Sequence, residues 1–134
     1  MATAKFTENP LTSDSTNKHT GAVGEDMAVS LLEATGYKII ERNYRCLFGE
    51  IDIIARDGSV IVFVEVKSRR SKLFGEPELS VDLNKQKKLS KVALHYLGEQ
   101  NLHNTNARFD VVAILLIPGR DEVRHIENAF DLAY

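Results

Sequence analysis

The chain has 134 residues, 43% of them hydrophobic and 27% charged, with a net charge of −2, which suits one soluble globular domain and excludes a disordered chain. Its single cysteine, Cys46, excludes an internal disulfide and a cysteine-based zinc site, and its longest apolar run, 111–117, is too short to span a bilayer. The N-terminus lacks the apolar core of a signal peptide, so we expect a cytoplasmic protein without a membrane partner.

The N-terminal part of the chain changes character after residue 20. Residues 1–20 are rich in Thr, Ser and Asn and show no periodicity, so we expect a flexible arm in front of a single domain over 21–134. Apolar residues then recur at helical spacing from Val23 to Ala34, which predicts a first helix. Thr20 is of a type that favours an N-cap, and Gly36 is of a type that favours a C-cap.

Three strands are predicted after this helix, from "YKIIERNYR", "GEIDIIAR" and "SVIVFVEVK". The last two are separated by Asp57-Gly58, a strong signal for a two-residue hairpin loop. A turn-rich segment follows, and then a second helix is predicted from about Asp82 to Gly98. "RFDVVAILLI" and "EVRHIEN" predict two more strands. A crossover through the second helix allows the third and fourth strands to be parallel, so we expect an α/β fold with a mixed β-sheet flanked by helices.

Charged residues interrupt the apolar strands of the hairpin at Asp52, Glu65 and Lys67. Buried charges are costly unless they are paired, hydrogen-bonded or bound to a metal. With Asp57-Gly58 as the loop, Asp52 is expected opposite Phe63 and diagonal to Glu65. Side chains alternate along a strand, so all three charged residues are predicted on one face of the sheet.

This cluster has a catalytic and a structural interpretation. Two nearby carboxylates, with no Cys or His beside them, suit Mg²⁺ or Mn²⁺ rather than Zn²⁺. A metal at Asp52 and Glu65, with Lys67 near the attacking water, is the arrangement that phosphodiester hydrolysis needs. The alternative is a salt bridge between Lys67 and one of the carboxylates, without any chemistry.

The segment from Lys67 to Lys91 holds eight basic and three acidic residues, a balance of +5 that leaves −7 for the rest of the chain. A local positive charge of this kind attracts a polyanion, although charged runs are also common on solvated faces. Its position next to the carboxylates favours nucleic-acid contact through the phosphate backbone. The candidate nucleic-acid-binding residues are Arg69, Arg70, Lys72, Lys85, Lys87, Lys88 and Lys91.

The motifs also carry a family resemblance. Asp52, twelve intervening residues and then Glu65-Val66-Lys67 resemble the D…ExK core of restriction-endonuclease-like nucleases, whose αβββαβ core is similar to the predicted order. "GAVGEDMA", "GYKIIERNYR", "GEIDIIARDG", "FVEVKSRR" and "RFDVVAI" resemble the bacterial YraN family, an uncharacterised group likened to Holliday-junction resolvases. The likeness covers roughly residues 21–130.

The resemblance implies a restriction-endonuclease-like fold and a Mg²⁺- or Mn²⁺-dependent endonuclease that acts on DNA rather than RNA, with branched DNA as one substrate class and a homodimer as one assembly. It implies that Asp52 and Glu65 bind the metal, that Lys67 is the catalytic lysine, and that Glu25 adds a third acid from the first helix. By itself, Glu25 is explained equally well as an acid favoured near a helix N-terminus. The alternative function is a non-catalytic nucleic-acid-binding module that retains the fold.

Two further groups of polar residues are predicted to be structural. Arg108 and Asp110 alternate on the fourth strand, which favours ion pairing over catalysis. The four histidines show no metal-binding spacing and no Ser or Cys partner for a nucleophilic site.

Overall fold

The computed structural model describes residues 13–70 and 81–132, with side chains from residue 21 onward. The elements follow the predicted α-β-β-β-α-β-β order. Their bounds are α2 (Ser13–Ala34), β1 (Lys38–Cys46), β2 (Gly49–Asp57), β3 (Val60–Arg69), α3 (Leu83–Glu99), β4 (Ala107–Leu115) and β5 (Glu122–Phe130).

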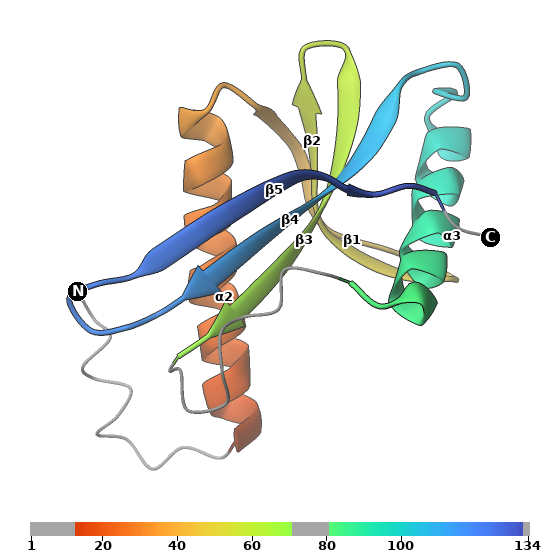
Figure 1. The fold of residues 1–134 in the computed structure, drawn as a ribbon. Helices are drawn as coiled ribbons and strands as arrows, with labels where there is room; N and C mark the ends of the chain where they lie inside the picture. The colour runs from red at the N-terminus through yellow and green to blue at the C-terminus, as the bar shows by residue number, and fades with distance from the viewer. Residues whose placement is uncertain (1–12, 71–80, 133–134) are drawn as a thin grey trace.

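The strands form one five-stranded sheet in the order β1-β2-β3-β4-β5. Strands β3 and β4 are parallel and connected through α3, while the other neighbouring pairs are antiparallel. The two helices lie on either side of the sheet (Figure 1). The predicted mixed α/β architecture is therefore confirmed, and it is consistent with an αβββαβ nuclease-like core.

Two hydrophobic cores hold the helices to the sheet. On the α3 side, Val92 and Tyr96 pack in one buried cluster with Phe63 of β3. On the α2 side, Leu32 packs in a second cluster with Val62 of β3. Adjacent residues of β3 thus serve opposite cores, as the two-residue period of a strand requires. Each such side chain contributes about 1.5–3 kcal/mol when it is fully buried.

Helix α2 begins earlier than predicted. It starts at Ser13, so Thr20 lies within the helix and is not its N-cap. The polar sequence of residues 13–20 lacks the apolar spacing by which a helix is recognised, which explains the missed turns. Residues 1–12 of the predicted arm lie outside the described residues.

The end of α2 agrees with the prediction. Gly36 has φ +101°, its N–H bonds to the carbonyl of Glu33, and the N–H of Tyr37 bonds to the carbonyl of Leu32. These two bonds form a Schellman motif, in which glycine is favoured because it adopts a positive φ without steric cost.

The β2–β3 turn lies one residue further along than predicted. Asp57 pairs with Val60, so the two-residue loop consists of Gly58 and Ser59. Gly58 has φ +61°. Type II′ turns need a positive φ at the first loop position and take glycine there, which explains why Asp57 stays in the strand.

This turn changes the expected register by two residues. Ile54, rather than Asp52, lies opposite Phe63. Continued along the strands, the observed pairing places Asp52 directly level with Glu65 instead of diagonal to it. Because side chains alternate with a period of two, a shift of two residues leaves the predicted faces unchanged.

A polar network joins three strands, and Tyr37 just before β1, on the α2 side of the sheet. Arg108 donates to Asp110 at 2.9 Å, to Asp57 at 3.0 Å and to the hydroxyl of Tyr37. A 2.8 Å hydrogen bond joins Nε2 of His125 to Asp110, which is fully buried. Burial favours a raised pKa for Asp110, but the hydrogen bonds from His125 and Arg108 outweigh it, so the pKa of Asp110 is lowered. These contacts support the predicted structural role of Arg108 and Asp110.

Candidate active site

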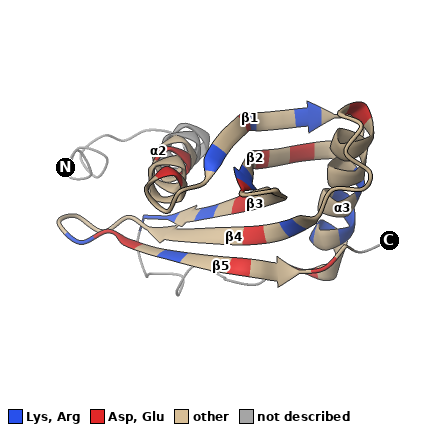
Figure 2. Cartoon of the chain, turned by 90° about the horizontal axis from the view of Figure 1, so that it is seen from above, with Lys and Arg blue, Asp and Glu red and all other residues tan. Residues whose placement is uncertain are grey.

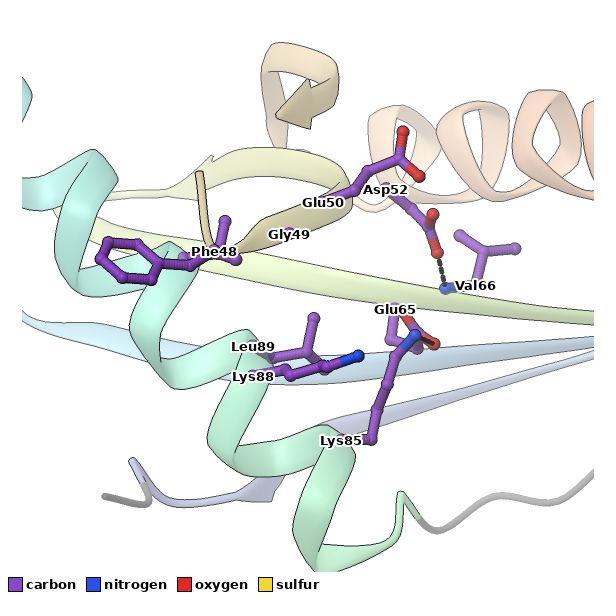
Figure 3. A pocket seen from close by; sticks show the side chains of 10 residues that line it. Phe48, Gly49, Glu50, Asp52, Glu65, Val66, Lys85, Lys88 and Leu89 are labelled. Atoms are coloured by element: carbon purple, nitrogen blue, oxygen red, sulfur yellow. Dashed lines mark hydrogen bonds and ion pairs between the residues drawn. The ribbon is translucent and has the colours of Figure 1, made fainter. Parts of the chain in front are cut away.

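The candidate site lies where β2 and β3 diverge. Their residue-by-residue pairing ends at Ile53 and Val64. Beyond that pair, the Asp52 carboxylate accepts a 2.8 Å hydrogen bond from the backbone N–H of Val66 (Figure 3). The side chain thus provides an acceptor for a backbone donor at a point where the strands part.

Strand β2 is irregular at Asp52. Ile53 packs in the core on the α2 side, whereas Ile51 packs in the core on the α3 side, although strict alternation would place them on one face. Across the ladder, Asn43 of β1 adopts a left-handed conformation with φ +54°. The local twist turns the Asp52 carboxylate into the gap between the diverging strands.

Asp52 and Glu65 form a pair of neighbouring carboxyl groups. Both side chains line the same pocket, so the charge of Glu65 acts on the Asp52 carboxyl. Burial, and next the charge of Glu65, raise the pKa of Asp52 to about 7. The Val66 N–H opposes this rise, and the charge of Glu25 adds to it. Two acidic groups, Asp52 and Glu65, are therefore close together at a half-buried place where ionisation of both is unfavourable.

A pocket of about 310 Å³ opens beside this pair, on the side of α3. Lys85 and Lys88 reach into it from the first turns of α3 (Figure 3). The ammonium group of Lys85 lies 3.5 Å from Glu65. The main polar and aromatic groups that line the pocket are Phe48, Glu50, Asp52, Glu65, Lys85 and Lys88.

The contact between Lys85 and Glu65 was not predicted, since Lys85 was assigned only to the nucleic-acid surface. Asp82 caps α3 by accepting a 2.9 Å hydrogen bond from the Lys85 N–H. The cap fixes the start of the helix, and the crossover from β3 into α3 brings that start close to the end of β3. An N-cap followed by lysines, after a strand that ends in an acid, is the signal that could have indicated this pairing.

Glu25 approaches the pair from α2. It accepts hydrogen bonds from Nε of Arg42 at 2.9 Å and from the side-chain amide of Asn43 at 3.0 Å. Its side chain is only 13% exposed. Sequence reasoning did not find Arg42 and Asn43 as partners, because contacts between a helix and a distant strand leave no periodic signal. Through Asn43, Glu25 is tied to the same irregular part of β1 that faces Asp52.

Close packing of α2 on β3 sets the position of Glu25. A Cβ at Gly24 would lie 1.8 Å from Oγ of Ser68 and 2.8 Å from its Cβ. Only glycine allows this approach, since both distances are below those that real Cβ atoms tolerate. Glu25, the next residue, therefore takes its place from the contact between Gly24 and Ser68.

Lys67 follows Glu65 by two residues on β3 and pairs with Ala113 of β4. Strand alternation places its side chain on the α3 side of the sheet, the side of the pocket. It is partly exposed and lies just outside the ten described residues that line the pocket. The structure thus brings Asp52 and Glu65 together in one pocket, whereas Glu25 and Lys67 do not line it and lie on opposite sides of the sheet.

The sequence matches the model of the uncharacterised protein family UPF0102 over residues 24–114. The chain belongs to this family. The match confirms the YraN family membership that the motifs indicated, since the YraN family is UPF0102.

Individual UPF0102 relatives are similar over almost their whole length. The UPF0102 protein of Syntrophus aciditrophicus is 57% identical over 118 residues, which cover 88% of this chain and 93% of the relative. That of Geobacter sulfurreducens is 51% identical over 119 residues, with 88% and 93% covered. That of Thermodesulfovibrio yellowstonii is 51% identical over 110 residues, with 82% and 94% covered.

Two of the candidate nucleic-acid-binding residues of this UPF0102 chain, Lys85 and Lys88, line the pocket. Arg69 and Arg70 are partly exposed at the end of β3, and Lys72 lies outside the described residues. Several Lys positions follow α3 on its exposed surface (Figure 2). They are Lys85, Lys87, Lys88 and Lys91. Neither described helix of the UPF0102 chain has the length and apolar character to span a membrane.

The carboxylates of the pocket are the candidate metal ligands of this UPF0102 chain. Within residues 21–70 and 81–132, no three His, Cys, Asp or Glu side chains are grouped tightly enough to hold an ion by themselves. Mg²⁺, however, is commonly held by one or two carboxylates, with water and substrate phosphate oxygens as the other ligands. Asp52 and Glu65 offer only oxygen donors, and a divalent cation would relieve their repulsion. The pair therefore fits Mg²⁺ or Mn²⁺ better than Zn²⁺.

Proposed function

We propose that this protein is a metal-dependent endonuclease that hydrolyses phosphodiester bonds in DNA. One observation carries the proposal: the half-buried carboxyl pair Asp52–Glu65 lines a pocket that Lys85 and Lys88 also line. Such a pocket combines a site for a divalent cation with positive charge for the phosphate backbone. The family's likeness to Holliday-junction resolvases suggests branched DNA as the substrate.

Each residue has a separate role in this proposal. Asp52 and Glu65 hold Mg²⁺ or Mn²⁺, and the bound ion supplies a Lewis acid for the scissile phosphate. Lys67 orients the attacking water and offsets charge that develops on the phosphate. Glu25 completes the acidic set from the α2 side, in a position fixed by Arg42 and Asn43.

The direct test is cleavage of linear, nicked, flapped and four-way-junction DNA in the presence of Mg²⁺ or Mn²⁺. The Asp52→Ala variant is expected to cut at least about 100-fold more slowly, because metal-assisted charge stabilisation contributes several kcal/mol. Glu33→Gln, which changes an exposed acid on α2, is the matched control and should cut like the parent. If Asp52→Ala cleaves as fast as the parent, the proposal is wrong.

A second candidate function is a nucleic-acid-binding module without catalysis. The ion pair between Lys85 and Glu65 favours it, because it places a protein cation beside the metal-binding carboxylates. This candidate predicts binding that needs no metal and that is unchanged by Glu65→Ala. Metal-stimulated cleavage by the parent protein would exclude it.

Binding in either case is expected to depend on salt through the lysines of α3. Replacing Lys88 or Lys91 by Gln should lower the slope of log K against log salt concentration by about one, because each phosphate contact releases one counterion. Lys38→Gln, at an exposed site at the start of β1, should leave the slope unchanged. Fluorescence anisotropy with a labelled duplex at several salt concentrations measures these slopes. Equal slopes for all variants would contradict binding by α3.

A further inference from the structure

The turn between β1 and β2 carries two neighbouring apolar side chains in water. Leu47 is 90% exposed and Phe48 is 44% exposed. Single exposed apolar residues are ordinary, but Phe48 also lines the pocket that holds Asp52 and Glu65 (Figure 3). An aromatic ring is thus displayed to solvent at the rim of the candidate active site.

Local contacts fix the position of this ring. The backbone N–H of Phe48 lies 3.4 Å from Sγ of Cys46, which closes the turn. The ring of Phe48 meets the ring of His95 on α3 edge-on, with 5.9 Å between centroids and 67° between planes. Such pairs are favourable in this geometry. These contacts fix the orientation of the Phe48 ring, so the turn presents part of that ring to solvent.

The groups along the pocket occur in an order that suits a single nucleic-acid strand. The carboxylates Asp52 and Glu65 lie at one end, the ammonium groups of Lys85 and Lys88 come next, and Phe48 lies beyond them against α3 (Figure 3). Proteins that bind single strands combine a positive groove for the backbone with aromatic rings on which bases stack. Bases in a duplex are already stacked on their neighbours, so only an unpaired base can use such a ring without distorting the helix.

We propose that Phe48 stacks on an unpaired nucleobase and so selects DNA with a single-stranded segment beside the cleavage point. This inference rests on the proposed nuclease function, and it names the substrate class: flaps, forks and junction arms rather than continuous duplex. Lys85 and Lys88 line the same pocket as Phe48, and their positive charge favours a polyanion over an uncharged apolar partner at this surface. The alternative is that a second copy of the chain binds to Phe48.

The chain has no tryptophan, so Phe48→Trp places a unique fluorescent reporter on the rim. The experiment uses the full-length chain with Asp52→Asn also present, so that DNA stays intact. A single-stranded oligonucleotide is expected to quench this fluorescence, whereas a hairpin duplex of equal length is not. Val123→Trp, an exposed position on the opposite edge strand β5, is the control and should respond to neither. Equal responses of the two reporters would overturn the inference.

Affinity supplies a second readout. Phe48→Ala should weaken binding of the single strand by about 5- to 150-fold, the usual loss for one stacked base, and leave duplex binding unchanged. Equal losses for both forms, or none, would contradict stacking. If instead Phe48→Ala abolishes a concentration-dependent dimer in sedimentation, the rim is a self-association surface and the inference is wrong.

Cleavage then separates this inference from the proposed function. If the parent cuts flapped DNA faster than duplex and Phe48→Ala removes that preference, both proposals hold. If the parent cuts both substrates and Phe48→Ala changes neither rate, only stacking fails. If quenching is seen but nothing is cut, the nuclease proposal fails and single-strand recognition remains.

Discussion

Replacing Asp52 by Asn is expected to stabilise the metal-free protein at pH 8 by roughly 2–4 kcal/mol. The carboxyl of Asp52 has a pKa raised from 3.8 to about 7 by burial and by Glu65, so at pH 8 it is ionised in a place that disfavours charge. Asn keeps the shape and an oxygen acceptor for the Val66 N–H, but carries no charge. Thermal and urea unfolding of the two proteins at pH 8 measure the difference.

The same pKa sets the direction of the pH dependence. Between about pH 4 and pH 7 the folded protein holds a proton on Asp52 that the unfolded chain has released. The free energy of unfolding therefore decreases as pH rises through this range, and it does so less in Asp52→Asn. Glu50→Gln, a surface change two residues earlier on β2, should alter stability by less than about 0.5 kcal/mol. If the free energy of unfolding depends on pH in the same way in the parent and in Asp52→Asn, the pKa of Asp52 is not raised in the folded protein.

Addition of Mg²⁺ or Mn²⁺ should reduce this difference in stability between the parent and Asp52→Asn. A cation that binds only the folded state stabilises it by about 2.7 kcal/mol at 100 times its Kd. The parent should gain melting temperature with the metal, whereas Asp52→Asn should gain little. An equal gain in both proteins would mean that the cation binds elsewhere.

Gly24→Ala is expected to destabilise the protein by about 3 kcal/mol and to disturb the site without touching any of its charges. The new methyl group would lie 1.8 Å from Oγ of Ser68, so α2 must move away from β3. Glu25 would move with the helix and lose its hydrogen bonds to Arg42 and Asn43. Chemical denaturation measures the loss of stability, and the cleavage assay measures the effect on the site.

Variants of Ser68 provide the control for this prediction. Ser68→Gly removes both clashing atoms, so combined with Gly24→Ala it should recover much of the stability. Ser68→Ala alone should be neutral or stabilise by up to about 1 kcal/mol, because Ser68 Oγ is buried and has no hydrogen-bond partner among the described residues. If the double variant is as unstable as Gly24→Ala, the contact does not explain the need for glycine.

Features with a local periodic signal could be predicted from the sequence. The strand pattern around Phe63 and Glu65 predicted a buried hairpin, and Gly36 predicted the end of the first helix. The turn at Gly58 was placed one residue too early, because Asp-Gly favours a turn without determining which residue takes the positive φ. The expected proximity of Asp52 and Glu65 did not depend on this error, since a shift of two residues preserves which side chains share a face.

Contacts between distant segments could not be predicted in this way. The pairing of Glu25 with Arg42, and of Glu65 with Lys85, depends on how two helices dock on the sheet. The partial exposure of Phe48 depends on how the turn between β1 and β2 lies against α3. Periodicity reports which side of an element is buried, but it does not report which residue of another element lies across the contact.

The network around Arg108 and Asp110 has a consequence for how function is assigned within the family. It ties together the part of the hairpin near its turn, while the carboxylates occupy the part where β2 and β3 diverge. Loss of Asp52 or Glu65 would remove no member of either hydrophobic core. A homologue could therefore lose these carboxylates, and with them the catalytic activity, and still keep the fold. Whether a relative keeps the reaction should therefore be judged from the residues at the positions of Asp52, Glu65 and Lys67. The fold alone does not answer this question, because it can be conserved after the reaction is lost.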